Sequence, residues 1–403
     1  VGLLQARLDA LPPADRLAAR QASVIGHVFW DEALAALDAK APQALPALQR
    51  SAFVRSHATS DFEGTVERQF DHHLLHQVTY DTLVRAERRQ GHSAVAHWLA
   101  TRTRERGAEF LAMTGDHAER AGETALAIDC FDQAASEARR RFANSAAEDW
   151  LRRALVLLGE SDPARRYELL NRLNNIADTV GDRDRQEAVQ QEMAALLDRH
   201  PDDARRARCL VSEALLADRR SDTAASEQLA LQAVELAERC GAAEAAAMAQ
   251  GQLCWLHIAR NDMVGARGHA DAALRWAGRI EIEADRVENE AKLLVLSAMV
   301  LMAAEELGAA LEALQSVLSR SEAMGSARLS LSALDNLAVT TAMLGHWDAS
   351  IGWAVRMRDL AQSSGALPRL AHALHHLAVA RQALGIDPDR PVVTGTLYNG
   401  VQR

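Results

Sequence analysis

The chain has 403 residues, of which 48% are hydrophobic, 25% charged and only 4% aromatic. This composition excludes a disordered chain, and the abundance of Ala and Leu with few β-branched runs predicts a mainly α-helical fold. The formal net charge of −10 argues against nucleic acid or an anionic membrane as a partner, because both attract basic surfaces. The sequence also lacks the run of about 18 uncharged apolar residues that a membrane span needs.

Four cysteines lie far apart and form neither a CxxC pair nor the Cys/His spacing of a zinc module. They are Cys130, Cys209, Cys240 and Cys254. This usage predicts reduced, mostly buried thiols in a cytoplasmic protein.

Residues 1–105 differ in pattern from the rest of the chain and are predicted to form a separate small domain. Helices are predicted at residues 3–11, 14–23, 31–39 and 42–51. An extended run at 53–55 and an alternating run at 66–70, with a turn at 61–64 between them, predict a β-hairpin. Helices followed by a β-hairpin are typical of a winged helix. Two more helices are predicted at 71–89 and 92–104.

The helix predicted at residues 42–51 is the candidate for entering a DNA groove. Such a helix needs basic and amide side chains, and this segment offers only Gln43, Gln49 and Arg50 among Ala, Leu and Pro. We therefore expect a regulatory packing role for the domain, and we do not expect nucleic acid as a partner of this chain.

A turn pattern recurs about every 40 residues between residues 170 and 385 and predicts a stacked array of helical hairpins. Each turn residue is followed five positions later by a small or polar residue. The turns are Gly181, Ser221, Asn261, Glu305 and Gly345, and the following residues are Gln186, Ser226, Ala266, Ala310 and Ser350. Large and small residues alternate between the turns, as close packing of antiparallel helices requires. Asn174 and Glu213 depart from the pattern, because they occupy positions where a small or apolar residue is expected.

This array is predicted to span residues 106–386. It includes one more unit at residues 111–138, upstream of the pattern that begins at residue 170. A tail at 387–403 is predicted to be flexible, because Asp387 and Pro388 replace the second helix of the last unit. The pattern resembles the tetratricopeptide repeat, in which small residues let each hairpin close. The usual period of that repeat is about 34 residues, so a period of about 40 implies longer helices.

Two stretches, at residues 4–30 and 68–99, resemble the segment that follows the ATPase module in bacterial STAND-type signalling ATPases. Those proteins are often fused to a class III adenylate/guanylate cyclase or to a LuxR-like DNA-binding domain. The second stretch matches the family pattern FxHxLLxxVxYxxL. The matching residues are Phe70, His72, Leu74, Leu75, Val78, Tyr80 and Leu83.

The resemblance implies a winged-helix regulatory domain leading into a tetratricopeptide sensor arm. Such an arm binds a protein, a peptide or a small effector in the concave face of its repeats. The chain has no GxxxxGK[ST] loop and no strand-linked acidic residues of a cyclase, so we expect no enzyme activity and no cofactor. An ATPase or cyclase domain would then precede Val1. The alternatives are the sensor region of a LuxR-like ATPase transcription regulator and a stand-alone repeat scaffold.

Four residues in the repeats are predicted to face the groove and contact a partner, on the basis of helical phase. They are His257, Trp276, His372 and His376. Two histidine clusters, at residues 72–76 and 372–376, have the i, i+3 spacing of metal ligands. No acidic or cysteine residue is placed to complete the first cluster, for which we expect a packing role. For the second we expect a solvated or groove-lining helix face, and we expect no metal at either. Trp347 is predicted to pack in a hairpin core.

Overall fold

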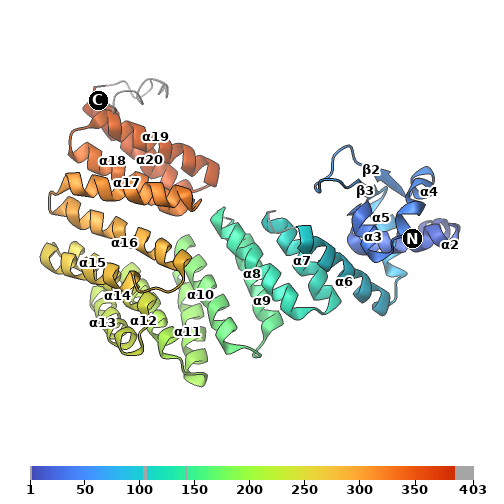
Figure 1. Cartoon of the computed structure of the whole chain (residues 1–403), viewed down its shortest axis with the longest axis horizontal. Helices are drawn as coiled ribbons and strands as arrows, with labels where there is room; N and C mark the ends of the chain where they lie inside the picture. Colours follow the sequence, from blue (N-terminus) through green and yellow to red (C-terminus); the bar gives the residue numbers. More distant parts are fainter. Residues whose placement is uncertain (1, 103–106, 142, 386–403) are drawn as a thin grey trace. The chain divides into compact units, whose positions relative to one another are not determined.

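The computed structural model of the chain describes residues 2–102, 107–141 and 143–385, apart from the side chains of residues 284 and 285 (Figure 1). The tail predicted at residues 387–403 lies outside the described residues. Almost every described element is a helix, so the prediction of a mainly α-helical fold is confirmed. The described residues form two compact units. The first contains residues up to 139 and residues 144–162, and the second contains 140–143 and the residues from 163 onward, within the described ranges.

The first unit contains a three-stranded sheet among helices. Its elements are α1 (Gly2–Asp9), α2 (Pro13–Ile25), β1 (Val28–Trp30), α3 (Asp31–Leu37), η1 (Ala41–Ala44), α4 (Leu45–Arg50), β2 (Val54–Ser56), β3 (Glu67–Phe70), α5 (His73–Asp81), α6 (Arg85–Arg102), α7 (Ala108–Ala121), α8 (Thr124–Arg140) and α9 (Asn144–Leu158). Helices α7–α9 belong to this unit although the repeat pattern begins in α7. The domain boundary at residue 105 stays a prediction.

The sheet has the order β1–β3–β2, with both pairs antiparallel. The hairpin predicted from the sequence is confirmed as β2 and β3, where Arg55 pairs with Gln69. Strand β1 was not predicted, because a three-residue strand is too short to show an alternating pattern. It pairs through Phe29 with Arg68. Fully buried aromatic rings, among them Phe29 and Phe70, form the core beneath the sheet. The assignment of these elements to the winged-helix fold stays a prediction.

The helix predicted at residues 71–89 is wrong in extent, because α5 ends at Asp81 and α6 starts at Arg85. Thr82 closes α5 by donating its hydroxyl to the Thr79 carbonyl at 2.6 Å. Helix α6 then continues through Gly91, where the sequence predicted a break. A Cβ at this position would lie 2.9 Å from a methyl carbon of Val24 on α2. Gly91 therefore allows two helices to cross closely and does not end a helix.

A chain of hydrogen bonds through two buried histidines connects α5, α6 and α7. The Tyr80 hydroxyl lies 2.8 Å from His92 Nε2, and His92 Nδ1 lies 2.9 Å from His117 Nδ1. His117 is also hydrogen-bonded to the backbone of Ile25. One proton on each imidazole satisfies every link, whereas protons on all four ring nitrogens would place the two Nδ1–H groups face to face. The geometry therefore excludes a state in which both histidines are charged.

Burial lowers the pKa of His92 to about 4 and that of His117 to about 3, with further lowering by the charge of Arg120. Below pH 6.5, the ordinary pKa of histidine, these side chains bind protons in the unfolded chain but not in the folded chain. The free energy of unfolding therefore decreases as the pH is lowered. We expect a loss of about 2 kcal/mol per histidine between pH 7 and pH 5. Urea unfolding followed by circular dichroism at both pH values measures this loss.

The double substitution of His92→Gln and His117→Gln should flatten this pH dependence, whatever its effect on stability at pH 7. His97→Gln is the matched control, since that side chain is largely exposed on the same helix. An equal pH slope in the double variant and in the wild type would refute the assignment.

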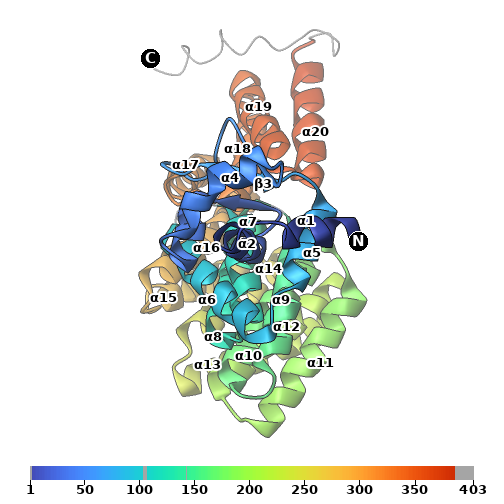
Figure 2. The same cartoon turned by 90° about the vertical axis from the view of Figure 1, so that its right-hand side faces the viewer.

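The second unit is a succession of helical hairpins (Figures 1 and 2). Its helices are α10 (Pro163–Val180), α11 (Arg183–Arg199), α12 (Asp203–Arg219), α13 (Thr223–Cys240), α14 (Ala243–Ala259), α15 (Met263–Ala277), α16 (Glu283–Ala303), α17 (Leu307–Ala323), α18 (Ala327–Met343), α19 (Trp347–Ser364) and α20 (Leu367–Ala383). Figure 2 shows the last two, α19 and α20, side by side. This is a tetratricopeptide-like α-solenoid, as predicted.

Left-handed turn residues separate the two helices of each hairpin. All five predicted turn residues have positive φ, namely Gly181 (79°), Ser221 (63°), Asn261 (59°), Glu305 (63°) and Gly345 (76°). The five residues that follow them at the fifth position are all buried. In three hairpins an aspartate caps the second helix and accepts a bond of 3.0 Å from the backbone N–H three residues on. These are Asp182, Asp222 and Asp262.

The even-numbered helices from α12 to α20 pack each against the next and form a continuous layer, whereas each odd-numbered helix packs mainly against its even-numbered neighbours. An array with one layer more closely spaced curves toward that layer, so these helices line its inner side. Helix α10 contacts α12 far less than α12 contacts α14. The inner layer is therefore interrupted between α10 and α12.

Replacement of Glu305 by Gly should stabilise the array. A left-handed backbone costs an ordinary residue about 1–2 kcal/mol, and the greater flexibility of Gly in the unfolded chain offsets part of the gain. We expect a net increase of about 1 kcal/mol in the free energy of unfolding. Asn261→Gly should change it by less than about 0.5 kcal/mol, because Asn tolerates this conformation. Urea unfolding measures both, and an equal effect of the two substitutions would contradict the explanation.

Candidate functional site

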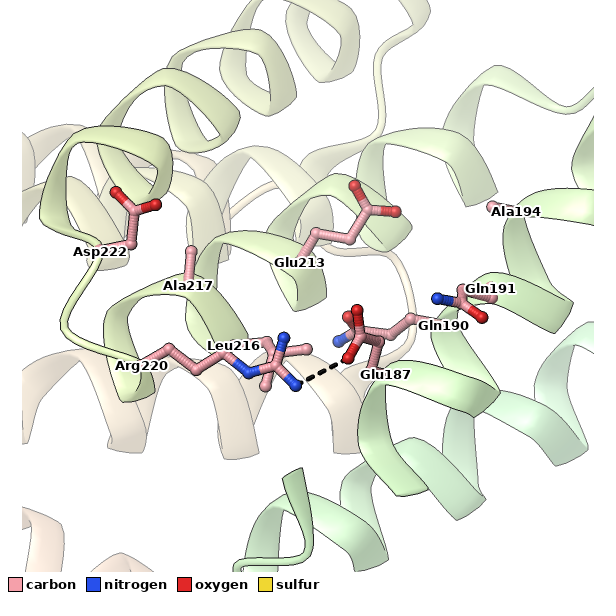
Figure 3. Close-up of a pocket in the computed structure, with 9 residues that line it drawn as sticks. All are labelled: Glu187, Gln190, Gln191, Ala194, Glu213, Leu216, Ala217, Arg220 and Asp222. Carbon is pink, nitrogen blue, oxygen red and sulfur yellow. Dashed lines mark hydrogen bonds and ion pairs between the residues drawn. The ribbon is translucent and has the colours of Figure 1, made fainter. Parts of the chain in front are cut away.

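A cavity of about 530 Å³ opens between α11 and α12 (Figure 3). We call it the α11–α12 pocket. Its lining residues are Glu187, Gln190, Gln191, Ala194, Glu213, Leu216, Ala217, Arg220 and Asp222. The volume lies within the range of roughly 300–1,000 Å³ that is usual for ligand sites. The pocket lies at the hairpin boundary where the inner layer is interrupted.

Three polar residues replace an apolar cluster of the repeat at this boundary. Forty residues further on, the equivalent positions are filled by an apolar cluster between α12, α13 and α14, namely Ala214, Ala230 and Leu253. Between α10, α11 and α12 the same positions hold Asn174, Gln190 and Glu213. Larger polar side chains thus occupy sites where the next repeat packs hydrocarbon. Such a substitution gives up apolar burial, which is worth about 25 cal/mol per Å².

Two hydrogen bonds fix the orientation of the Gln190 amide group. The residue is only 4% exposed. Its Nε2 donates to Asn174 Oδ1 at 3.1 Å and to the Ser212 carbonyl at 2.9 Å. Because a backbone carbonyl can only accept, the amide nitrogen must face Ser212. Both amide hydrogens are thus committed, and Oε1 is left as an acceptor on a pocket-lining side chain.

The Glu213 side chain supplies a second acceptor. Its carboxylate accepts a hydrogen bond of 3.3 Å from the Cys209 thiol. Burial raises the pKa of Cys209 to about 12, with a further contribution from the charge of Glu213, so the thiol remains a donor. A thiol is a weak donor. Within the described residues no basic side chain forms an ion pair with Glu213, so most of the hydrogen-bonding capacity of this carboxylate is open to a ligand.

The single arginine of the pocket already has a partner. Arg220 donates to Glu187 at 2.7 Å, joining α12 to α11 across the pocket (Figure 3). This hydrogen bond lowers the pKa of Glu187. The same pair recurs forty residues on, where Arg260 donates to Glu227 at 2.7 Å. Its recurrence indicates a contact between hairpins. The pocket is therefore rich in acceptors and has few free donors.

Two of the predicted partner-binding residues lie elsewhere in the array. His257 lies at the end of α14, with Nδ1 2.7 Å from Oδ2 of Asp262, the capping residue of α15. Trp276 on α15 is half-buried, packs against apolar residues of the adjacent hairpins and carries the Arg279 guanidinium 4.5 Å above its ring. Neither lines the α11–α12 pocket. Their role in partner binding stays a prediction.

The structure brings the other two predicted residues together around a carboxylate. His376 on α20 lies 2.6 Å from Asp335 on α18, and His372 lies 3.4 Å from it. Arg369 donates to the same carboxylate at 2.7 Å. Burial acts to raise the pKa of Asp335, but the hydrogen bond from His376 and the charge of Arg369 outweigh it, and the pKa is lowered. This cluster joins two helices of the inner layer, and its role in partner binding stays a prediction.

The pocket was not predicted as a site, although the sequence contained a signal for it. Asn174 and Glu213 stood out as departures from the repeat pattern. Gln190 did not, yet the same forty-residue offset compares it with Ala230. Only the packing of α11 against α12 shows that the three departures meet.

Within the described residues no group of three or more His, Cys, Asp or Glu side chains is arranged to hold a metal ion. Of the two histidine clusters, the first is tied to the backbone through His76, whose Nε2 lies 2.9 Å from the Ser23 carbonyl. None of the described helices combines the length and apolar character that crossing a membrane requires.

No family model matches this chain, and no curated protein matches it. Solved structures of similar architecture include a signal-transduction ATPase with a tetratricopeptide-repeat sensor from Pyrococcus horikoshii (12% identity, TM-score 0.44, 94% of this chain covered). This chain spans 61% of the length of that protein. A second is a Rap protein complexed with competence and sporulation factor (13% identity, TM-score 0.48, 75% of this chain and 83% of that chain covered). A third is the apo form of the quorum sensor NprR from B. thuringiensis (11% identity, TM-score 0.43, 88% of this chain and 97% of that chain covered).

Exchange of residue types between equivalent repeat positions tests the energetic cost of the pocket. Glu213→Leu should raise the free energy of unfolding by about 1 kcal/mol, because an uncompensated carboxylate is replaced by hydrocarbon. Leu253→Glu at the equivalent position should lower it by about 3 kcal/mol or more, because that site is closed and apolar. Chemical unfolding measures both. Destabilisation by Glu213→Leu would show that the carboxylate serves packing alone.

Proposed function

We propose that this chain is a non-catalytic binding module whose helical repeats take a protein or peptide ligand, with the α11–α12 pocket as one contact point. The observation that carries the proposal is the exchange of an apolar cluster for Asn174, Gln190 and Glu213 at one hairpin boundary. It gives up packing and supplies hydrogen-bond acceptors that the chain itself leaves unused. A folded array gains nothing in stability from such an exchange, whereas a ligand gains affinity from it.

The form of the array supports a long ligand. Stacked hairpins present an extended inner surface, and a chain lying along it contacts several repeats at once. The inner layer carries polar groups of its own, such as the Asp335 carboxylate with its cluster on α20. A peptide or a segment of a protein can bind at several such points together.

We further propose that the module is the regulatory arm of a signal-transduction ATPase or an adenylate cyclase-like protein. Support comes from the family pattern that begins at Phe70, which lies on β3 and α5 of the first unit. The test is the gene sequence upstream of Val1, translated in frame. An open frame with a phosphate-binding GxxxxGK[ST] loop supports this context, and a stop codon preceding a start signal contradicts it.

Panning of a phage-displayed library of random dodecapeptides against the immobilised chain tests the binding function. We expect related sequences to be enriched over empty matrix and to bind as synthetic peptides with micromolar Kd, measured by titration calorimetry. The matched control is a pocket-filled variant with Asn174→Ala, Gln190→Ala and Glu213→Leu, which restores the residue types of the next repeat. Absence of enrichment on the wild-type chain would overturn the proposed function.

A further inference from the structure

We propose that the α11–α12 pocket binds the guanidinium group of an arginine side chain on the peptide or protein ligand. This inference rests on the proposed function and names the chemistry of one of its contacts. It follows from the hydrogen-bonding capacity, the charge and the apolar lining residues of the pocket.

The hydrogen-bonding capacity selects a donor. Gln190 Oε1 accepts only, because Asn174 and Ser212 hold its amide hydrogens. The Glu213 carboxylate is likewise an acceptor, and the Cys209 thiol occupies only part of it. These acceptors lie on the two helices that form the pocket walls, α11 and α12. A ligand group that satisfies both must offer several donors and no acceptor.

The charge of the lining selects a cation. Three carboxylates, those of Glu187, Glu213 and Asp222, stand against the one guanidinium of Arg220. Arg220 pairs with Glu187, and Asp222 uses Oδ1 to cap α13 through the Ala225 N–H at 3.0 Å. An anionic group would meet a net negative site with no free cation. A cationic group instead supplies the partner that Glu213 lacks.

The shape of the donor favours guanidinium over ammonium. Five N–H groups lie in one plane and point in several directions, so one guanidinium can donate to a carboxylate and to an amide oxygen at once. The lining also includes the apolar residues Ala194, Leu216 and Ala217. These side chains can contact the three methylene groups of an arginine stem while its charged end reaches the acceptors.

A peptide from the library selection is the probe. It is synthesised in three forms that carry arginine, lysine or citrulline at the same position, since citrulline keeps the shape of arginine and removes its charge. On wild-type protein, citrulline should weaken binding about tenfold or more. On Glu213→Gln the same exchange should cost about twofold or less, because the two changes remove one interaction. Titration calorimetry measures every Kd.

Two controls keep the result specific. Glu227→Gln removes the same charge from the array outside the pocket and should leave the citrulline effect unchanged. Circular dichroism of Glu213→Gln confirms that this variant folds. The pocket-filled variant should also lose binding, and it does so without placing a new amide group at residue 213.

The remaining outcomes separate this inference from the proposed function. Enriched peptides without a required arginine, or with lysine equally effective, overturn the guanidinium assignment and leave peptide binding intact. A citrulline effect of the same size on wild type and on Glu213→Gln also overturns it. Agmatine is a small compound with a free guanidinium group. If agmatine displaces the peptide when both are at equal concentration, the pocket binds small guanidinium compounds and the proposal of an arginine from a peptide or protein is overturned. Absence of any enriched peptide overturns the proposed function, and this inference with it.

Discussion

Close approach of antiparallel helix backbones is the constraint on which the repeat array depends. In four of the hairpins a small residue lies five positions after a left-handed turn, as with Ala266 after Asn261 and Ala310 after Glu305, and both alanines are fully buried. Side chains of this size let the helices contact along their length, where many weak dispersion contacts add up. The turn fixes the register, so the small residues of one helix meet the large residues of the other.

The same constraint makes stability local. Each hairpin contacts only its neighbours, so a change at one boundary is felt mainly there. This explains how the boundary between α11 and α12 can hold Gln190 and Glu213 while the next boundary holds Ala230 and Leu253. The buried amide of Gln190 is tolerated because its N–H groups reach Asn174 and Ser212, since a buried donor without a partner is costly.

The repeat array was predictable from the sequence because its turns need unusual backbone angles and its hairpins need small residues at fixed offsets. Short elements were not predictable in this way. Strand β1 is too brief to show a period, and Gly91 looks like a helix end until its packing against Val24 is seen. The pocket illustrates a different limit. Two of the three polar residues that replace the apolar cluster, Asn174 and Glu213, depart from the repeat pattern singly. That they come together with Gln190 depends on contacts between hairpins, and periodicity along one helix cannot reveal those contacts. His257 and Trp276 were chosen from helical phase alone, and both make contacts with neighbouring residues of the array.

The interruption of the inner layer between α10 and α12 has a mechanical consequence. The resistance of a stack of hairpins to bending comes from the contacts between successive hairpins. From α12 to α20 the inner layer is continuous, whereas α11 and α12 meet where that layer is interrupted, and their contact is less extensive. We therefore expect the array to bend most easily at that joint, and the ligand proposed above would add contacts at this same point.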